Sequence, residues 1–262
     1  GPAGMEAAVT LKQRGFDVVV FDKRDEIGGN LHVAKKPPFK GKFEWAIDYY
    51  KSMAKKLNIT MKLGKEVTAQ EVLALKPYSI LVATGSNVIS IPLEGLDQVQ
   101  TVQAHDVLVN DMQFANKKVV VIGGGITGLE TALYINRQGT NQVSVVDMLP
   151  EWPVDMLDMR YQNEALLEVR HCNDQGVTLY YNNKVVKFAD GKLFIESTKD
   201  GEVKELPADV IVLSVGVKPN DALWQELLAS GHPSVWKAGD AIATGKINKA
   251  VLHGSKFGYS LN

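Results

Sequence analysis

The sequence contains very little cysteine. Its 262 residues include one, Cys172, so an internal disulfide, a redox-active cysteine pair and a cysteine-ligated iron–sulfur cluster are all excluded within this chain. A single thiol fits a reducing cytoplasm, which is the expected location. The adjacent His171 does not complete a zinc site, because one histidine and one cysteine are too few ligands. We expect Cys172 to be a structural or solvent-facing thiol and His171 to lie at the surface.

An excess of charge of one sign and a long apolar run are also missing. The formal net charge is −1, so no basic stripe is available for nucleic acid and no polybasic run for an anionic membrane. No apolar run is long enough to span a bilayer. Apolar residues make up 45% and charged residues 23%, which is typical of a globular protein, and the length predicts two domains. Nucleic acid and membrane are therefore not expected partners.

Glycine is present in a pattern that predicts a nucleotide site. Residues 118–122 are KVVVI, a β-branched run typical of a buried parallel strand. The next residues, GGGITG, match G-x-G-x-x-G at Gly123, Gly125 and Gly128. The helix-like segment LETALYINRQG and a second strand, QVSVVD, follow and end at Asp147. This order of strand, glycine turn, helix, strand and acid is typical of a dinucleotide-binding unit.

Each residue type in this unit has a chemical reason. Gly123 permits a tight turn, Gly125 lets a pyrophosphate approach the backbone, and Gly128 lets the helix pack closely on the strand. The helix N-terminus offers free N–H groups and a partial positive charge to phosphate. Asp147 is placed to accept a hydrogen bond from a ribose 2′-OH. We therefore predict a dinucleotide at this turn.

The same acid favours NAD over NADP. Asp147 would repel a 2′-phosphate, and the following Met148 and Leu149 supply no arginine to bind one. Arg137 and Arg160 remain alternatives, since either could fold back into the site. Hydride transfer needs no nucleophile–base pair, and we expect no catalytic residue of that kind.

The opening of the chain is a second, shortened copy of this unit. Gly1 corresponds to Gly125 and Gly4 to Gly128. MEAAVTLKQRG is the expected helix, and the strand DVVVFD ends at Asp22. The first glycine and the strand before it are missing, although that strand is central in a doubly wound sheet. We therefore expect this chain to be a segment of a longer polypeptide, or the missing strand to be present in the protein.

Further motifs extend the pattern over the whole chain. The ordered set GPAG, DKRDEIGGN, VATGS, GGGITGLE, SVGVKPN and AGDA resembles the flavoprotein reductases with two dinucleotide-binding domains. The resemblance implies an α/β fold in which an NAD domain is inserted into an FAD domain, both Rossmann-like. The stretch GGNLHVAKKPPFKGKFEWAIDYYKSMAKKL resembles the C-terminal half of the group of 2,4-dienoyl-CoA reductase, 2-enoate reductase and trimethylamine dehydrogenase, NADH:flavin oxidoreductases. In that group, this half follows a TIM barrel that binds FMN and an iron–sulfur cluster.

The resemblance implies a set of FAD contacts. In sequence order they are Gly1 and Gly4 at the pyrophosphate, Asp22 at the adenosine ribose, Arg24, Gly28, Gly29 and Asn30 beside adenine and pyrophosphate, Val67 near adenine, Thr84 and Gly85 at the crossover between domains, Gly239 and Asp240 at the ribityl chain and pyrophosphate, and Ile247 at the start of a helix aimed at the flavin ring. For Asp240, a helix N-cap is the alternative role.

The resemblance also completes the NAD site. It adds Thr127, Glu130 and Gly216 to Gly123, Gly125, Gly128 and Asp147. Glu130 would contact the nicotinamide carboxamide, or else be a capping or solvent-facing residue of the first helical turn.

The motif order predicts the domain boundaries. Residues 1–102 and 233–262 would form the FAD-binding domain, and residues 103–232 the NAD(P)-binding domain. Within the latter, VTLYYNN, KVVKFADGK, LFIESTK and ELPADVIVL predict a small antiparallel sheet with a hairpin turn at Asp200-Gly201.

Three functions fit the sequence. The first is a module that passes hydride from NADH to FAD and electrons on to an upstream FMN and iron–sulfur domain of the same polypeptide, where an enoate-type substrate is reduced. The second is a free-standing NADH:acceptor reductase with a protein electron carrier. The third is a non-redox domain in which the first site holds ADP as a structural ligand. The Gly239-Asp240 pair favours FAD, because ADP has no ribityl chain.

Overall fold

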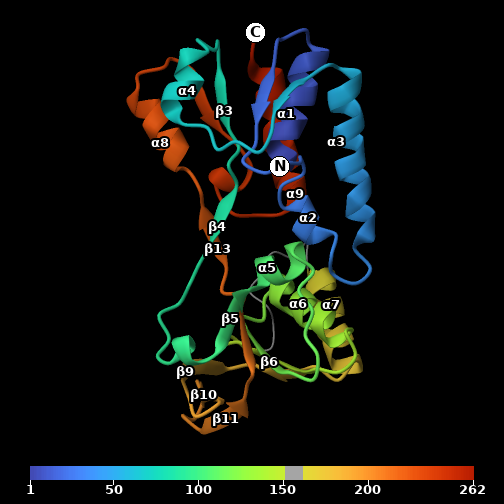
Figure 1. Cartoon of the computed structure of the whole chain (residues 1–262), viewed down its shortest axis with the longest axis vertical. Coiled ribbons are helices and arrows are strands. Elements are labelled where there is room, and N and C mark those ends of the chain that lie inside the picture. The colour runs from blue at the N-terminus through green and yellow to red at the C-terminus, as the bar shows by residue number, and fades with distance from the viewer. Residues whose placement is uncertain (151–161) are drawn as a thin grey trace. The chain divides into compact units, whose positions relative to one another are not determined.

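The structure is a computed structural model that describes residues 1–150 and 162–262. Its elements form two compact units (Figure 1). Unit 1 comprises Gly1–Lys35, Lys40–Asn87 and Val217–Asn262, and unit 2 comprises Lys36–Phe39 and Val88–Gly216. The second unit interrupts the first in the sequence, which is the inserted arrangement that the sequence predicts.

The boundaries between the two units lie at different residues from those that the motif order predicted. They fall after Asn87 and after Gly216, not after residues 102 and 232. The strand β5 (Gln100–Gln103) pairs with a strand of unit 2. The helix α8 (Ala222–Ala229) places Leu227 in the core of unit 1. Hydrogen bonding and packing of these two segments therefore set the boundaries, and the assignment of FAD and NAD to the units stays a prediction.

Four strands of unit 1 form two separate parallel pairs. β1 (Val19–Phe21) pairs with β2 (Thr60–Lys62), and β3 (Ile80–Val82) pairs with β14 (Val235–Lys237). A further pair, β4 (Ser86–Val88) and β13 (Val217–Pro219), lies where the chain passes from one unit to the other. The helices of unit 1, besides α8, are α1 (Pro2–Gln13), α2 (Leu31–Ala34), η1 (Gly41–Phe43), α3 (Glu44–Lys56), α4 (Ala69–Ala74), η5 (Gly239–Ala241) and α9 (Ile247–Ser260).

Helices α1 and α9 pack unusually closely because two glycines of α9 face α1. A Cβ atom on Gly254 would lie 2.2 Å from the carbonyl oxygen of Ala3, and one on Gly258 would lie 2.6 Å from Cβ of Thr10. Ala3 thus lies opposite Gly254 and Thr10 opposite Gly258, so the two helices run in the same direction. Since each helix N-terminus carries a partial positive charge, both positive ends lie on the same side of unit 1.

Unit 2 is built on a five-stranded parallel sheet with the strand order β5-β12-β6-β7-β8. The strands after β5 in this order are β12 (Val210–Leu213), β6 (Lys118–Ile122), β7 (Gln142–Val146) and β8 (Thr178–Tyr180). In the described part of unit 2, the helices are η2 (Leu96–Gln98), α5 (Ala104–Val109), α6 (Ile126–Asn136) and α7 (Gln162–Asp174). This mixed α/β architecture confirms the predicted fold class.

Both faces of the parallel sheet are buried. Along β6, Val119 and Val121 contribute to one core cluster, together with α6, whereas Val120 and Ile122 contribute to the other. Successive side chains of a strand point to opposite faces, so the continuous apolar run KVVVI follows directly from burial on both sides. The second cluster includes residues of an antiparallel sheet, β9 (Asn183–Ala189), β10 (Lys192–Ser197) and β11 (Val203–Pro207).

The antiparallel sheet is smaller than the sequence predicted. The hairpin turn at Asp200-Gly201 is confirmed between β10 and β11, with Gly201 at φ 77°. The segments around β8 and β12 were expected in this sheet as well, but both belong to the parallel sheet. All four residues of β12 are buried, and such a strand fits the centre of a parallel sheet, where both faces are covered.

Cys172 lies in the core of unit 2 beside α6. Its side chain is fully buried, so the structural alternative is confirmed and the solvent-facing one is wrong. Burial raises the pKa of the thiol to about 12. His171 is half-buried, and its Nδ1 is 3.8 Å from Glu168, so the expected surface position is only partly correct.

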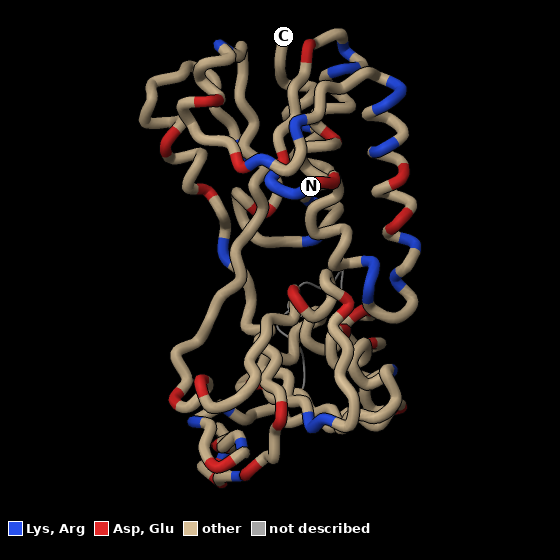
Figure 2. Tube along the Cα trace, viewed as in Figure 1, with Lys and Arg blue, Asp and Glu red and all other residues tan. Residues whose placement is uncertain are grey.

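Charged residues of both signs are mixed along the described trace of both units (Figure 2). Within residues 1–150 and 162–262, no helix combines the length and apolar character needed to cross a bilayer.

Candidate functional site

The glycine turn of unit 2 lies between β6 and α6, and its geometry requires glycine at two positions. A Cβ atom on Gly123 would lie 2.3 Å from the carbonyl oxygen of Ser214, and Gly123 has φ 109°. A Cβ on Gly128 would lie 1.9 Å from the carbonyl oxygen of Gly123. Helix, turn and the end of β12 are therefore in direct backbone contact, which brings the start of α6 to the carboxyl end of the sheet.

The N-terminus of α6 has no side chain to cap it. Its N-cap is Gly125, and its first turn contains no acidic residue. Gly125 has no side chain that could cap these N–H groups. The N-terminus of a helix carries a partial positive charge, which would favour an anionic phosphate at this end of α6.

Asp147 follows β7 and braces the glycine turn. Its Oδ2 accepts a hydrogen bond from the N–H of Gly124 at 2.6 Å, and its Oδ1 accepts from the N–H of Leu149 at 2.8 Å. Sequence reasoning gave Asp147 only a ribose contact and missed this bracing. Each carboxylate oxygen can accept more than one hydrogen bond, so both roles are compatible. Tyr181 also adjoins the turn, since a Cβ on Gly124 would lie 3.3 Å from its ring.

The other predicted NAD residues lie around this turn at different depths. Thr127 is exposed on α6, whereas Glu130 is buried, with 7% of its surface accessible. A solvent-facing role for Glu130 is therefore wrong. Gly216 is exposed two residues after Ser214, the residue that contacts Gly123. The structure thus brings the predicted NAD residues into one region of unit 2.

The arginines that could have favoured NADP are not both described. Nε of Arg137 donates to the side chain of Gln175 at 3.1 Å, and the guanidinium stacks on Phe39, 4.5 Å from the ring centre. Arg160 lies outside the described residues. Among the residues that the structure describes, Asp147 is a charged group at the glycine turn.

The start of α1 reproduces the arrangement at α6. Its N-cap is Gly1, and its first turn contains no acidic residue. Asp22, directly after β1, has its Oδ2 3.6 Å from the amino nitrogen of Gly1 and accepts from the N–H of Arg24 at 3.0 Å. Gly4 packs against Ala83, the residue after β3, since a Cβ there would lie 3.4 Å from Cβ of Ala83. The sequence alignment of the two copies therefore corresponds to a structural match.

A second glycine turn, Gly28-Gly29, contacts the start of α1. Both glycines have positive φ, 123° and 54°. A Cβ on Gly29 would lie 2.8 Å from Cα of Gly1. Nη1 of Arg24 donates to the Gly29 carbonyl at 3.0 Å, and the exposed Asn30 follows as the N-cap of α2. Arg24, Gly28, Gly29 and Gly1 thus lie together, and their contacts with FAD stay a prediction.

A third turn, Gly239-Asp240, lies between α1 and α9. A Cβ on Gly239 would lie 3.0 Å from Cβ of Ala3. Asp240 accepts from the N–H of Gly245 at 3.1 Å and from Ser86 Oγ at 3.4 Å. Burial raises the pKa of this carboxyl above its usual value. The alternative role as a helix N-cap is wrong, because Lys246 is the N-cap of α9.

A histidine that sequence reasoning did not select supports this third turn. The N–H of Gly239 donates to Nδ1 of His253 at 3.3 Å. The imidazole of His253 thus holds the backbone of this turn against α9. Its signal in the sequence is weak, because His253 is fourteen residues away on α9.

The remaining predicted FAD residues also lie in unit 1. Val67 is half-buried just before Thr68, the N-cap of α4, in a loop whose Gly64 donates to the carbonyl of Arg24 at 2.7 Å. Thr84 is exposed and donates to the carbonyl of Asn220, and the Gly85 carbonyl accepts from the Asn220 N–H at 3.0 Å. Ile247 is the first residue of α9 and packs against the α1 core cluster.

Comparison with known proteins identifies relatives of the whole chain. Residues 1–251 match the family model described as pyridine nucleotide-disulphide oxidoreductase. An NADH oxidase of Thermoanaerobacter brockii is 31% identical over 269 residues, which cover 100% of this chain and 40% of that protein. A bilirubin reductase of Mediterraneibacter gnavus (strain CC55_001C) is 34% identical over 84% of this chain and 33% of its own length. The chain spans a minor part of these relatives.

A solved structure with the same fold is that of a 2-naphthoyl-CoA reductase in complex with 2-naphthoyl-CoA. It superimposes with a TM-score of 0.89 at 29% identity, over 100% of this chain and 38% of that one.

Proposed function

Because the chain belongs to the pyridine nucleotide-disulphide oxidoreductase family, we propose that it passes hydride equivalents from NADH to FAD as the electron-input part of a larger reductase. FAD occupies unit 1 and the nicotinamide nucleotide occupies unit 2. The observation that carries this proposal is the duplicated site: in each unit a helix with a glycine N-cap starts beside an acid that follows a strand.

The residues of unit 1 fit an FAD molecule. Two glycine turns, Gly28-Gly29 and Gly239-Asp240, meet at the start of α1. A side chain at Gly29 would collide with Gly1, and one at Gly239 would crowd Ala3. A pyrophosphate needs such close access to backbone N–H groups. Asp22 offers carboxylate oxygens to ribose hydroxyls. The third turn and the N-terminus of α9 lie beyond what ADP alone would need, which supports FAD over an ADP-only site.

When bound, FAD supplies the redox chemistry, because its ring accepts hydride and its reduced form passes electrons onward. The residues of the chain bind the two nucleotides and orient them. The helix N-termini of α1 and α6 stabilise phosphate charge, and the two aspartates hold ribose. Glu130, buried in unit 2, is the proposed partner of the nicotinamide carboxamide.

Asp147 supports a preference for NADH. Its carboxylate is fixed by two backbone N–H groups and cannot swing away from an incoming ribose without breaking them. A 2′-phosphate would bring negative charge against this fixed carboxylate. The expected discrimination is therefore against NADPH.

The electron acceptor after FAD cannot be a disulfide within this chain. The sequence has one cysteine, and Cys172 is buried in unit 2. We propose that electrons pass to an FMN and iron–sulfur domain, a TIM barrel of the same polypeptide, in the cytoplasm. The related bilirubin and 2-naphthoyl-CoA reductases support an unsaturated organic compound, of enoate type, as the final substrate.

Cofactor identification tests this proposal. The intact protein is heat-denatured, and the released nucleotides are separated and identified by mass. FAD is expected in about equal amount to the chain. Release of ADP without FAD would support the non-redox alternative, and release of neither would contradict the proposed site. FAD in a protein without FMN or an iron–sulfur cluster would support the free-standing reductase.

A further inference from the structure

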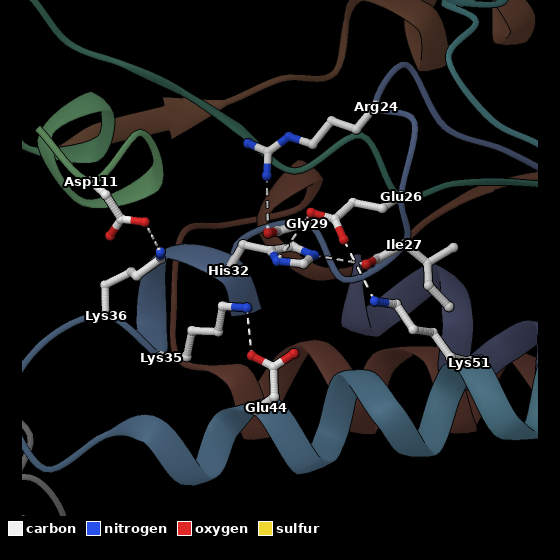
Figure 3. Close-up of polar contacts among 10 residues, drawn as sticks. All are labelled: Arg24, Glu26, Ile27, Gly29, His32, Lys35, Lys36, Glu44, Lys51 and Asp111. Atoms are coloured by element: carbon white, nitrogen blue, oxygen red, sulfur yellow. Dashed lines mark hydrogen bonds and ion pairs between the residues drawn. The ribbon is translucent and has the colours of Figure 1, made fainter.

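His32 is a buried histidine at the Gly28-Gly29 turn. It lies on the short helix α2, and 6% of its surface is accessible. A Cβ atom on Gly28 would lie 2.7 Å from its Nε2. The imidazole therefore packs directly against the backbone of the turn (Figure 3).

Both ring nitrogens of His32 face hydrogen-bond acceptors. Nε2 is 2.8 Å from the carbonyl oxygen of Ile27, and Nδ1 is 3.4 Å from Oε1 of Glu26. A carbonyl oxygen can only accept, so Nε2 carries a proton and donates to Ile27. Glu26 is also 3.5 Å from Nζ of Lys51 on α3. The ring is thus held in one orientation by the residues around it.

The carbonyls of the turn are all engaged by donors of the protein. The Ile27 carbonyl accepts from His32, the Gly28 carbonyl accepts from the N–H of Leu31 at 3.1 Å, and the Gly29 carbonyl accepts from Arg24 at 3.0 Å. A carbonyl oxygen carries partial negative charge and would repel a phosphate. Holding these oxygens on protein donors keeps that charge away from an anion bound at the turn. Arg24 also adds positive charge nearby.

We propose that His32 is a positioning residue for the cofactor pyrophosphate, acting through the Ile27 carbonyl and the Gly28 backbone. The ring does not touch the redox-active part of the cofactor. Without its Nε2 donor, the Ile27 carbonyl loses its partner, and the glycines, which have large conformational freedom, leave the arrangement that meets Gly1. This inference rests on the proposed function, because it requires FAD at this turn.

The test compares variants that move or remove the donor. His32→Gln places an amide N–H near the position of Nε2, His32→Asn places one near Nδ1, and His32→Leu has neither. His105→Leu, at a half-exposed histidine of unit 2, is the matched control. Apoprotein of each intact variant is titrated with FAD, and the quenching of flavin fluorescence gives the dissociation constant. Thermal unfolding of each apoprotein is measured in parallel.

The expected order of affinity separates positioning from general stability. His32→Leu and His32→Asn should bind FAD at least about tenfold more weakly than wild type, because a buried carbonyl loses its donor. His32→Gln and the control should stay within about threefold. Once saturated with FAD, the control His105→Leu should be reduced by NADH at the wild-type rate.

Three other outcomes overturn the inference. Equal dissociation constants for His32→Gln and His32→Asn would contradict it, even if His32→Leu fails to fold, since these two polar variants differ in where the donor lies. Wild-type protein that does not bind FAD would overturn the proposed function and this inference together. Wild-type binding with unaffected variants would overturn this inference alone.

Discussion

The carboxylate of Asp147 accepts a hydrogen bond from the backbone N–H of Gly124 at 2.6 Å. The acid at the end of β7 and the glycine turn after β6 are therefore one structural element. The same acid is the residue expected to meet the ribose, so the shape of the turn and the choice of nucleotide depend on a single side chain.

Two substitutions of Asp147 should separate these roles. Asp147→Asn keeps an acceptor oxygen but removes the charge, so kcat/KM for NADH should fall by less than about tenfold while the preference over NADPH largely disappears. Asp147→Ala removes the acceptor as well, and kcat/KM for NADH should fall by about 10- to 100-fold. Steady-state kinetics with both nucleotides provide the measurement.

Asp174→Asn is the control for these variants, because Asp174 is exposed on α7. Asp174→Asn should change kcat/KM neither for NADH nor for NADPH. An Asp147→Asn variant that still rejects NADPH as strongly as wild type would show that another group sets the preference.

Gly128 should not tolerate a side chain. In Gly128→Ala the new Cβ would meet the Gly123 carbonyl oxygen at 1.9 Å, and overpacking of this kind costs about 1–3 kcal/mol. The free energy of unfolding, measured by denaturant titration, should fall by that amount, and the KM for NADH should rise. The FAD content should be unchanged, since FAD is assigned to unit 1.

Gly41→Ala is the matched control, because a Cβ there would meet nothing within 4 Å. Its effect on the free energy of unfolding should stay within about 0.5 kcal/mol. Similar effects of the two substitutions would contradict the close contact between α6 and the turn.

Much of this arrangement could be predicted from residue patterns. The run KVVVI predicted a strand buried on both faces, and Val119 to Ile122 alternate between two cores as such a strand must. The glycine spacing predicted the turn before α6 and its shortened copy before α1. At the turn before α6, only glycine allows backbone contacts as short as those at Gly123 and Gly128. These features are local, so a short stretch of sequence carries them.

Contacts between distant segments could not be predicted in the same way. A run such as VIVL in β12 indicates a buried strand but does not say which strand it pairs with, so it was assigned to the wrong sheet. The hydrogen bonds of His32 to Ile27 and of His253 to Gly239 depend on rotamers and on helix placement. The burial of Cys172 depends on the packing of α7 against α6.

Cys172 should be inert in the folded protein and should affect stability only at high pH. Its pKa is raised from 9.0 to about 12 by burial, so the folded state keeps its proton where the unfolded state loses it. The stability that it contributes is complete below pH 9 and falls between pH 9 and 12. The loss is up to about 1.4 kcal/mol per pH unit.

Denaturant titrations of wild type and Cys172→Ala across this pH range measure the effect. The difference in unfolding free energy between the two proteins should be constant below pH 9 and should decrease above it. Ellman's reagent should not react with the native wild-type thiol at pH 8. Rapid labelling under native conditions would contradict the buried position.

Hydride transfer from NADH to FAD is tested by anaerobic titration of the intact protein with NADH, followed by visible absorbance. We expect the flavin band to bleach with NADH, and NADPH to reduce it at least about tenfold more slowly because of Asp147. A bound flavin whose spectrum stays unchanged with NADH would contradict hydride transfer between the two sites. Faster reduction by NADPH would contradict the role of Asp147.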